Sequence, residues 1–214
     1  MKIYPVIKRM ADFIAACLLL VICSPVFAVL FFLVRTETGG SFLYSQQRSG
    51  LNGKPFKMHK IRTMKVGTPE RSTAELKTPY KYITRIGRIL RKFSIDELPQ
   101  LLNILWGDMS FIGPRPVILR EEELIEMRRE KGALSAKPGI TGWAQVNGRD
   151  MMSNEVKSDF DAEYAQNVSF KMDAKVLFAT IKTVLTCKGY KEGGKKADST
   201  PPPLVVSTKV VKYR

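Results

Sequence analysis

Histidine and cysteine are scarce in this 214-residue chain, and their scarcity argues against several kinds of active site. The one histidine, His59, leaves almost no room for a histidine-based catalytic triad or a site with several histidine ligands. The three cysteines, Cys17, Cys23 and Cys187, form no CxxC pair and are odd in number, so they indicate neither a disulfide framework nor a zinc site. Whatever chemistry the chain performs must therefore use carboxylates and cations.

Acidic residues are also in the minority. The 20 Asp and Glu residues stand against 35 Lys and Arg, which gives a formal net charge of +15 and a pI near 9.8. The excess is concentrated between residues 48 and 92, where 13 basic residues accompany 2 acidic ones. This balance favours polyanionic partners, namely nucleic acid, an anionic membrane surface or phosphorylated substrates, and charge alone does not choose among them.

The longest apolar run, residues 10–34, predicts a membrane-embedded helix. The run "MADFIAACLLLVICSPVFAVLFFLV" carries one charge, Asp12, and exceeds the roughly 20 residues that a bilayer crossing needs. A cleaved signal peptide is the alternative, but its apolar core is normally about 7 to 15 residues. Here apolar residues continue past any plausible cleavage point near Ala28, so we expect the helix to be retained.

The middle of this run holds Ser24 and Pro25, and the proline predicts a kink. Each half is then about 15 Å of helix, which reaches only about midway into a 30 Å apolar core. Basic residues precede the run at Lys2, Lys8 and Arg9 and follow it, and positive flanks favour the cytoplasmic side. A helix that enters the membrane and returns satisfies both observations, while a kinked single span is the alternative.

Three further stretches predict elements of a folded domain. Residues 41–64 alternate around Asn52-Gly53 and predict short strands joined by a turn. Residues 81–93, "KYITRIGRILRKF", predict a basic amphipathic helix with Phe93 on its apolar side, and its basic face suits either solvent and lipid headgroups or substrate phosphate. A last helix, residues 173–185, is expected to open on a capping Asp173 and to pack on a core or an interface through Leu177, Ile181, Val184 and Leu185.

An adjacent pair of acids, Asp96 and Glu97, precedes leucines at helical spacing in "SIDELPQLLNILWGDMSFIGPRP", so a helix is predicted to begin at or just before the pair. Capping is one interpretation, because Ser94 and Glu97 match a capping box. Pro99 would fit the first turn better if Asp96 were the cap. In either arrangement we expect the helix dipole, with nearby Arg91 and Lys92, to keep Asp96 ionised as a nucleophile or metal ligand.

Two arginines lie in stiff, glycine-bordered loops downstream of the acids. Arg115 is held between Pro114 and Pro116, and Arg149 ends "KPGITGWAQVNGR". A rigid loop presents a guanidinium at low entropy cost, which suits a bidentate phosphate contact. A carboxylate pair, with Mg²⁺ and surrounding cations, indicates phosphoryl transfer. The membrane helix suggests a lipid partner, and a lipid phosphate is already ionised near neutral pH, so no histidine base is required.

These motifs resemble the bacterial sugar transferases, specifically the small monotopic phosphoglycosyl transferases. The resemblance lies in "FSIDELPQLLNILWGDMSFIGPRP", "KPGITGWAQVNGR", "HKIRTM" and the Ser24-Pro25 break, and it covers about residues 5–190. It implies a mostly helical α/β fold, with a re-entrant membrane helix hairpin at residues 1–36. A compact cytoplasmic catalytic domain with interfacial amphipathic helices and a short β-hairpin would follow at residues 37–190. The Gly-, Lys- and Pro-rich residues 191–214 are expected to be a flexible basic tail.

The activity that this resemblance implies is transfer of a phospho-sugar from a UDP-sugar to undecaprenyl phosphate, which releases UMP and initiates assembly of a surface glycan or glycoprotein. The implied mechanism is ping-pong, with a covalent phosphosugar intermediate and Mg²⁺ as cofactor. The implied location is the cytoplasmic leaflet of the bacterial inner membrane, and a homodimer is compatible with the family. Because no extra N-terminal membrane domain is present, we expect a short member of it.

The resemblance also implies roles for individual residues. Asp96 would be the nucleophile and a Mg²⁺ ligand, with Glu97 completing the dyad. Phosphates would be bound by Lys60, Arg91, Arg115 and Arg149, headgroups by Lys8 and Arg9, and the helix break made by Ser24 and Pro25.

A different class of protein shares the basic composition, namely a membrane-anchored module that binds anionic lipid or nucleic acid. Nucleic-acid binding needs stacking aromatics, and residues 81–93 offer only Tyr82 and Phe93. Purely electrostatic binding would weaken steeply with salt and would survive loss of Asp96. We therefore expect no nucleic-acid partner.

Overall fold

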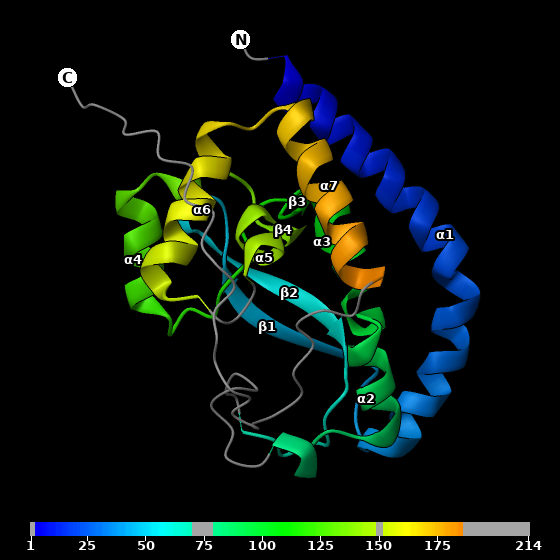
Figure 1. The fold of residues 1–214 in the computed structure, drawn as a ribbon. Coiled ribbons are helices and arrows are strands. Elements are labelled where there is room, and N and C mark those ends of the chain that lie inside the picture. The colour runs from blue at the N-terminus through cyan, green and yellow to red at the C-terminus, as the bar shows by residue number, and fades with distance from the viewer. Residues whose placement is uncertain (1–2, 70–78, 149–151, 186–214) are drawn as a thin grey trace, which may run out of the picture.

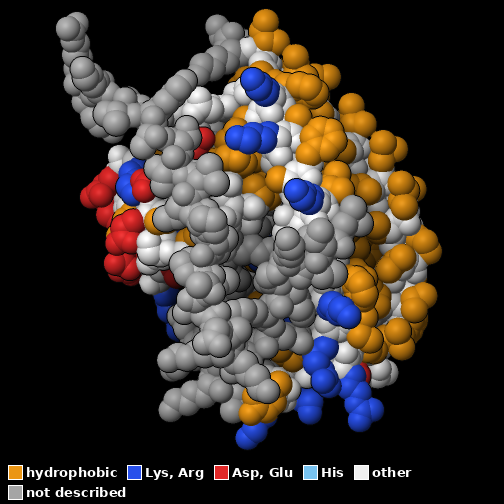
Figure 2. Space-filling view, viewed as in Figure 1, with side chains coloured by type: hydrophobic (Ala, Val, Ile, Leu, Met, Phe, Trp, Pro, Cys, Tyr) orange, Lys and Arg blue, Asp and Glu red, His pale blue; other side chains and the backbone are white. Residues whose placement is uncertain are grey.

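The long N-terminal helix α1 (Tyr4–Thr38) follows one edge of the molecule as a single arc (Figure 1). The computed structural model describes residues 3–69, 79–148 and 152–185 of the chain. Over this part α1 is the one helix that is long and apolar enough to cross a membrane. Most of its large apolar side chains are exposed, including Val21 at 72% and Phe32 at 70%, and they cover this edge in Figure 2. The predicted apolar helix is thus confirmed.

The predicted interruption at Ser24 and Pro25 takes the form of a bend within α1. Pro25 has no N–H to give to the carbonyl of Val21, four residues earlier. The hydroxyl of Ser24 donates to that same carbonyl at 2.8 Å, so the oxygen is not left without a donor. The helix therefore continues through the proline as one curved helix, and the predicted re-entrant course through the membrane stays a prediction.

Polar side chains near the start of α1 fasten it to the rest of the protein. Lys8 lies 2.6 Å from a carboxylate oxygen of Asp173. Arg9 donates to the carbonyls of Ile104 and Leu105, at 2.5 and 2.8 Å. Asp12 is buried and accepts a 2.7 Å hydrogen bond from the hydroxyl of Ser110. The structure therefore places Lys8 and Arg9 against the folded domain, and their contact with lipid headgroups stays a prediction.

Strands β1 (Leu43–Ser49) and β2 (Pro55–Ile61) form the predicted antiparallel hairpin. Their connection is the 3₁₀ turn η1 (Leu51–Gly53), where Asn52 has a φ of 55°, a left-handed value that asparagine tolerates better than most residues. Helix α3 (Gln100–Trp106) lies along the free edge of β2. The buried side-chain amide of Asn103 accepts from the backbone N–H of His59 at 3.0 Å and donates to the carbonyl of Lys57 at 2.7 Å. These two backbone groups of β2 therefore have hydrogen-bond partners.

Strands β3 (Ser110–Ile112) and β4 (Gly139–Thr141) pair in parallel. They bring together the two glycine-containing loops that are far apart in the sequence. A Cβ atom at Gly113 would lie 2.1 Å from the carbonyl oxygen of Lys137, so only glycine permits this approach of the two backbones. The loop that carries Arg115 therefore starts beside the loop that leads to Arg149.

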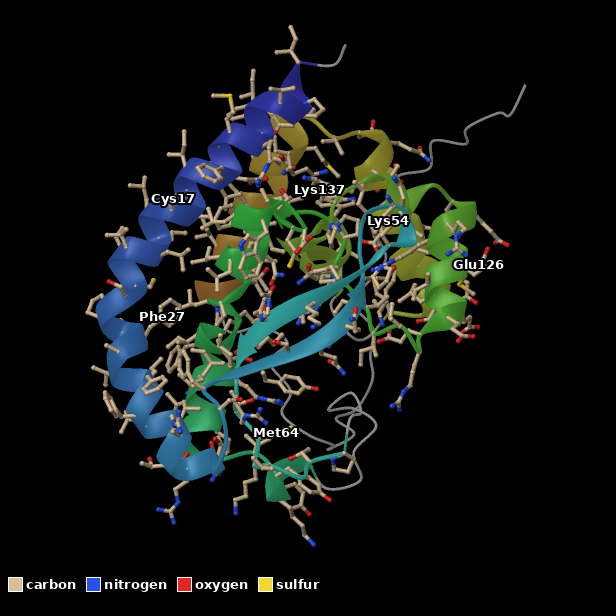
Figure 3. The ribbon with its side chains drawn as sticks, turned by 180° about the vertical axis from the view of Figure 1, so that it is seen from behind. Cys17, Phe27, Lys54, Met64, Glu126 and Lys137 are labelled. Carbon is tan, nitrogen blue, oxygen red and sulfur yellow. The ribbon has the colours of Figure 1, made fainter. Side chains whose placement is uncertain are left out.

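The remaining helices complete a mostly helical α/β fold, as the sequence predicted, with α4 (Glu122–Glu130) and α6 (Asn154–Gln166) on the side away from α1 (Figure 1). One core cluster joins α1, β2 and α3, and a second lies under the C-terminal helices. A third links Val34 of α1 with β2 and α2, and Phe27 reaches inward from α1 toward it (Figure 3). These helices and 3₁₀ turns are η2 (Pro79–Lys81), α2 (Arg85–Lys92), η3 (Ile95–Glu97), α4 (Glu122–Glu130), η4 (Ala133–Ser135), α5 (Trp143–Asn147), α6 (Asn154–Gln166) and α7 (Phe170–Leu185).

Two details of the predicted helices are wrong. Phe93 is 63% exposed and does not belong to the apolar side of α2, because the helix ends at Lys92 and Phe93 is its C-cap. Helix α7 begins at Phe170, so Asp173 lies in its first turn and does not cap it. The Asp173 carboxylate instead accepts from the hydroxyls of Tyr4 and Tyr164 as well as from Lys8.

The predicted apolar stripe of α7 does not face the core. Leu177 and Ile181 are each 47% exposed, whereas Met172 and Val176 are buried in the second core cluster. The exposed stripe agrees with an interfacial helix, one of the two alternatives that the sequence left open. The side chains of Val184 and Leu185 and the predicted tail, residues 191–214, lie outside what the structure describes.

Candidate active site

Asp96 and Glu97 occupy the 3₁₀ turn η3, and α3 begins only after it, at Gln100. The predicted capping box is wrong, because the Ser94 side chain makes no capping hydrogen bond and Ser94 itself has a left-handed φ of 55°. Pro99 is the N-cap of α3, a position where its missing N–H is harmless. The acids are therefore not employed in capping, which leaves their carboxylates for other interactions.

The left-handed backbone at Ser94 is a strained feature of this turn. For a residue other than glycine or asparagine such a conformation costs roughly 1–2 kcal/mol. Strain of this kind persists where the surrounding structure imposes it, and it is concentrated at functional sites. Here it connects the end of α2 directly to the turn that holds Asp96.

Glu97 holds two cations that come from distant parts of the chain. One oxygen, Oε1, lies 2.7 Å from the ammonium of Lys60 on β2 and 2.9 Å from a guanidinium nitrogen of Arg115. Burial acts to raise the pKa of Glu97, but the charges and hydrogen bonds of Arg115 and Lys60 outweigh it and hold the pKa far below its ordinary range. Glu97 is thus a fixed anion that fastens two of the predicted phosphate-binding side chains.

Asp96 differs from Glu97 in its hydrogen bonding and in the direction of its pKa shift. Its side chain is buried, with 7% exposed, and it forms no hydrogen bond with any residue that the structure describes. Burial raises its pKa and Glu97 adds to the rise, while Lys60, Arg91 and Arg115 act against it. The net shift of the pKa is upward, and the ionised state of Asp96 stays a prediction. A carboxylate poorly solvated and without a hydrogen-bond donor is a stronger nucleophile than a solvated one.

The other predicted cations have different outcomes. Arg91, on α2, donates through Nε to the hydroxyl of Thr63 at 2.8 Å and lies close enough to Asp96 for its charge to lower the pKa there. The side chain of Arg115 is 42% exposed and pairs with Glu97 at 2.9 Å. Arg149 lies outside the described residues, and its role stays a prediction.

Arg48 of β1 is a cation near this site that the sequence analysis did not single out, and its backbone bridges to Ile118, beyond the Arg115 loop. Burial and the nearby charge of Arg115 lower its pKa, and the charges of Glu121, Tyr44 and Glu97 act in the opposite sense. The alternation of residues along β1 could have indicated that Arg48 lies on the same face of the hairpin as Lys60. Tyr44 pairs with Lys60 across the hairpin, and residues two and four positions further along β1 share that face.

Mg²⁺ is the cofactor that the resemblance implies, and Asp96 fits it better than Glu97 does. Magnesium sites commonly combine one or two carboxylates with substrate phosphates and water. Asp96 has both oxygens uncommitted within the described residues, whereas Oε1 of Glu97 already binds two cations. Within residues 3–69, 79–148 and 152–185 no cluster of three or more acidic, histidine or cysteine side chains is placed to hold a metal. Substrate phosphates would have to supply the remaining ligands.

Comparison with known protein sequences finds relatives of this chain. The sequence model of the family described as Bacterial sugar transferase matches residues 3–187. An uncharacterized sugar transferase, EpsL of Bacillus subtilis, is 43% identical over 190 residues, which are 87% of this chain and 91% of the relative. The UDP-glucose:undecaprenyl-phosphate glucose-1-phosphate transferase of Escherichia coli is 38% identical over 82% of this chain and 39% of the enzyme.

A third relative acts on another sugar. The undecaprenyl-phosphate galactose phosphotransferase of Salmonella typhimurium is 37% identical over 86% of this chain and 41% of that protein. This chain therefore spans nearly all of EpsL and less than half of the two named enzymes. The match to the family model extends from the start of α1 to the end of α7, so it includes the long apolar helix as well as the acidic turn. The chain belongs to the bacterial sugar transferase family.

Proposed function

We propose that this protein transfers a sugar 1-phosphate from a UDP-sugar to undecaprenyl phosphate and releases UMP. The observation that carries the proposal is that the two acids of the turn η3 have different surroundings. Asp96 is buried without a hydrogen bond to any described residue, beside Glu97, which fastens Lys60 and Arg115. The names of two relatives, a glucose-1-phosphate and a galactose phosphotransferase, support the reaction class and leave the sugar open.

The reaction has two steps. In the first, a carboxylate oxygen of Asp96 attacks the phosphorus that bears the sugar, and the bond from that phosphorus to the bridging oxygen breaks. UMP leaves with the bridging oxygen and its electron pair, and Asp96 carries the phosphosugar as an acyl phosphate. In the second, an ionised oxygen of undecaprenyl phosphate attacks the same phosphorus. The acyl phosphate bond then breaks, which restores the carboxylate and yields the lipid diphosphate sugar.

The cations around Asp96 stabilise the charge that these steps move. Lys60 and Arg115 are held in place by Glu97 before any substrate binds, so they need little reorganisation when charge develops on the phosphoryl oxygens. Arg91 adds a third positive charge, and Arg149 is proposed as a fourth. When bound at Asp96, Mg²⁺ would neutralise phosphoryl oxygens of the donor.

The exposed apolar arc of α1 is proposed to enter the cytoplasmic leaflet of the bacterial inner membrane and return. Both ends of the arc contact the folded domain, through Lys8 and Asp173 at one end and Val34 at the other. A helix fastened at both ends to one domain supports a monotopic arrangement better than a single span. The product would begin the assembly of a surface glycan or glycoprotein.

The test is UMP release by the detergent-solubilised protein from a panel of UDP-sugars, with undecaprenyl phosphate and Mg²⁺. Release is expected with one or a few sugars, and a phosphosugar adduct is expected by intact mass when the lipid is omitted. Asp96→Asn should abolish both and keep membrane association, whereas the exposed-site control Asp159→Asn should be active. A protein that only binds anionic surfaces would release no UMP, and wild-type turnover by Asp96→Asn would refute the mechanism.

A further inference from the structure

A buried ion pair connects α4 and α6, which pack side by side on the far side of the molecule from α1 (Figure 1). Arg128 of α4 donates through Nη2 to Oδ2 of Asp161 in α6 at 2.5 Å. The exposed fraction of the two side chains is 5% and 1%, whereas Glu126, on the same helix, projects outward at the edge (Figure 3). The pair is therefore shielded from solvent and its geometry is fixed.

Stability alone does not account for this pair. Taking two charges out of water costs several kcal/mol for each ion, and replacing such a pair with apolar side chains is often neutral or stabilising. Here the pairing is incomplete, because Nε of Arg128 and Oδ1 of Asp161 are buried without a hydrogen-bond partner among the described residues. An arrangement with this desolvation cost is better explained by a further contact that the arginine makes.

Arg128 holds the loop of the active site. Its second nitrogen, Nη1, donates to the backbone carbonyl of Arg115 at 2.9 Å. The prolines on both sides of Arg115 have no N–H, so this loop is fixed largely through its carbonyls. Gly139 donates to the carbonyl of Pro114 at 3.0 Å and Ser49 to that of Val117 at 3.0 Å, and Arg128 fixes the carbonyl between them.

We propose that Arg128 and Asp161 are positioning residues that orient Arg115 for phosphate binding. Asp161 fixes the guanidinium of Arg128, Arg128 fixes the backbone of Arg115, and the guanidinium of Arg115 meets Glu97 at 2.9 Å. Arginine suits this role because its planar fork donates in two directions at once. The expected effect on kcat/KM rests on the proposed phosphoryl transfer. The expected effect of the ion pair on the Arg115 loop does not depend on that function.

The test uses the double variant Arg128→Leu/Asp161→Leu, since a single substitution would leave one buried charge without its partner. An apolar pair keeps the helices packed, so the thermal midpoint should stay at or above that of the wild type. The kcat/KM for the UDP-sugar is expected to fall roughly 10- to 100-fold, because small misplacements of a positioned group cost up to about 100-fold in rate. Wild-type kcat/KM in a folded double variant would overturn the proposal.

A mutant cycle shows whether the effect passes through Arg115. In an Arg115→Ala background, the double substitution should change kcat/KM by less than about twofold, since the group it positions is already gone. An undiminished loss in that background would overturn the proposal, because the pair would then act elsewhere.

Amide hydrogen exchange provides a readout that needs no turnover. The N–H of Gly113 donates to Thr141 and that of Ser49 to Val117, on either side of the Arg115 loop. Both should exchange faster in the double variant than in the wild type, and unchanged exchange would contradict the proposal. If the wild type shows no turnover with any UDP-sugar, the proposed function fails while this measurement still decides the positioning role.

Discussion

The ammonium of Lys60 lies 2.7 Å from Oε1 of Glu97, and this contact joins strand β2 to the turn that carries Asp96. Both partners also act on the charge state of Asp96, in opposite senses. The positive charge of Lys60 lowers the pKa of Asp96 and the negative charge of Glu97 raises it. The contact therefore makes the reactivity of Asp96 sensitive to two neighbouring side chains.

The pH dependence of adduct formation should reveal this coupling. In the proposed mechanism the reactive form of Asp96 is the anion, which is lost as pH falls through a pKa that burial holds above its ordinary value. Glu97→Gln removes a negative neighbour, so the acid limb should move to lower pH, and Lys60→Met should move it to higher pH. The measurement is the initial rate of phosphosugar adduct formation against pH, by intact mass. Shifts in the same direction would contradict this account of the site.

The fastening of α1 to the domain predicts a stability effect at Asp173. Asp173→Asn removes the charge that holds Lys8, while both side chains are largely buried, at 9% and 14% exposed. We expect the free energy of unfolding to fall by about 1–3 kcal/mol, measured by denaturant titration in detergent. Asp159→Asn is the matched control, because Asp159 is 66% exposed and its pairing with Lys131 should contribute at most about 1 kcal/mol. Equal effects of the two substitutions would contradict the proposed fastening.

Pro25 lies inside α1, and we expect the curvature of the helix to depend on it; the hydroxyl of Ser24 donates to the carbonyl of Val21, which receives no N–H from the proline. Replacing both Ser24 and Pro25 with leucine restores the helical hydrogen bond and should straighten the segment toward a full span. A tag at the N-terminus is expected to be inaccessible from outside intact cells in the wild type and to become accessible in this variant. Ser24→Ala, which keeps the proline, should leave the tag inaccessible, and an unchanged topology in the double variant would show that the bend does not cause re-entry.

Glycine at position 113 predicts a steric effect that can be separated from backbone strain. A Cβ atom there would meet the carbonyl of Lys137 at 2.1 Å, so Gly113→Ala should force β3 and β4 apart and cost both stability and activity. Gly132 has a φ of 74° with no atom within 4 Å of a Cβ, so Gly132→Ala should cost only about 1–2 kcal/mol of strain. A thermal midpoint lowered more by Gly132→Ala than by Gly113→Ala would contradict the close approach.

Local chemistry explains which elements were predictable. The hairpin follows from strand alternation around a turn that asparagine and glycine favour, and α1 follows from an apolar run. The errors occur where a distant partner decides the outcome. Asp173 looks like a cap in the sequence, but Lys8 and two tyrosine hydroxyls bind its carboxylate. Ser94 and Glu97 look like a capping box, but Glu97 faces Lys60 and Arg115 instead.

The sequence by itself determined the apolar helix, the hairpin, the family and the identity of the acidic pair, because these depend on residue type and spacing along the chain. The tertiary structure alone decided that Glu97 is bound by two cations while Asp96 makes no hydrogen bond with the described residues. It also decided that Arg48 lies beside the segment after the Arg115 loop and that Arg128 reaches that loop. Desolvation, charge coupling and hydrogen bonding depend on distances through space, and the fold sets those distances.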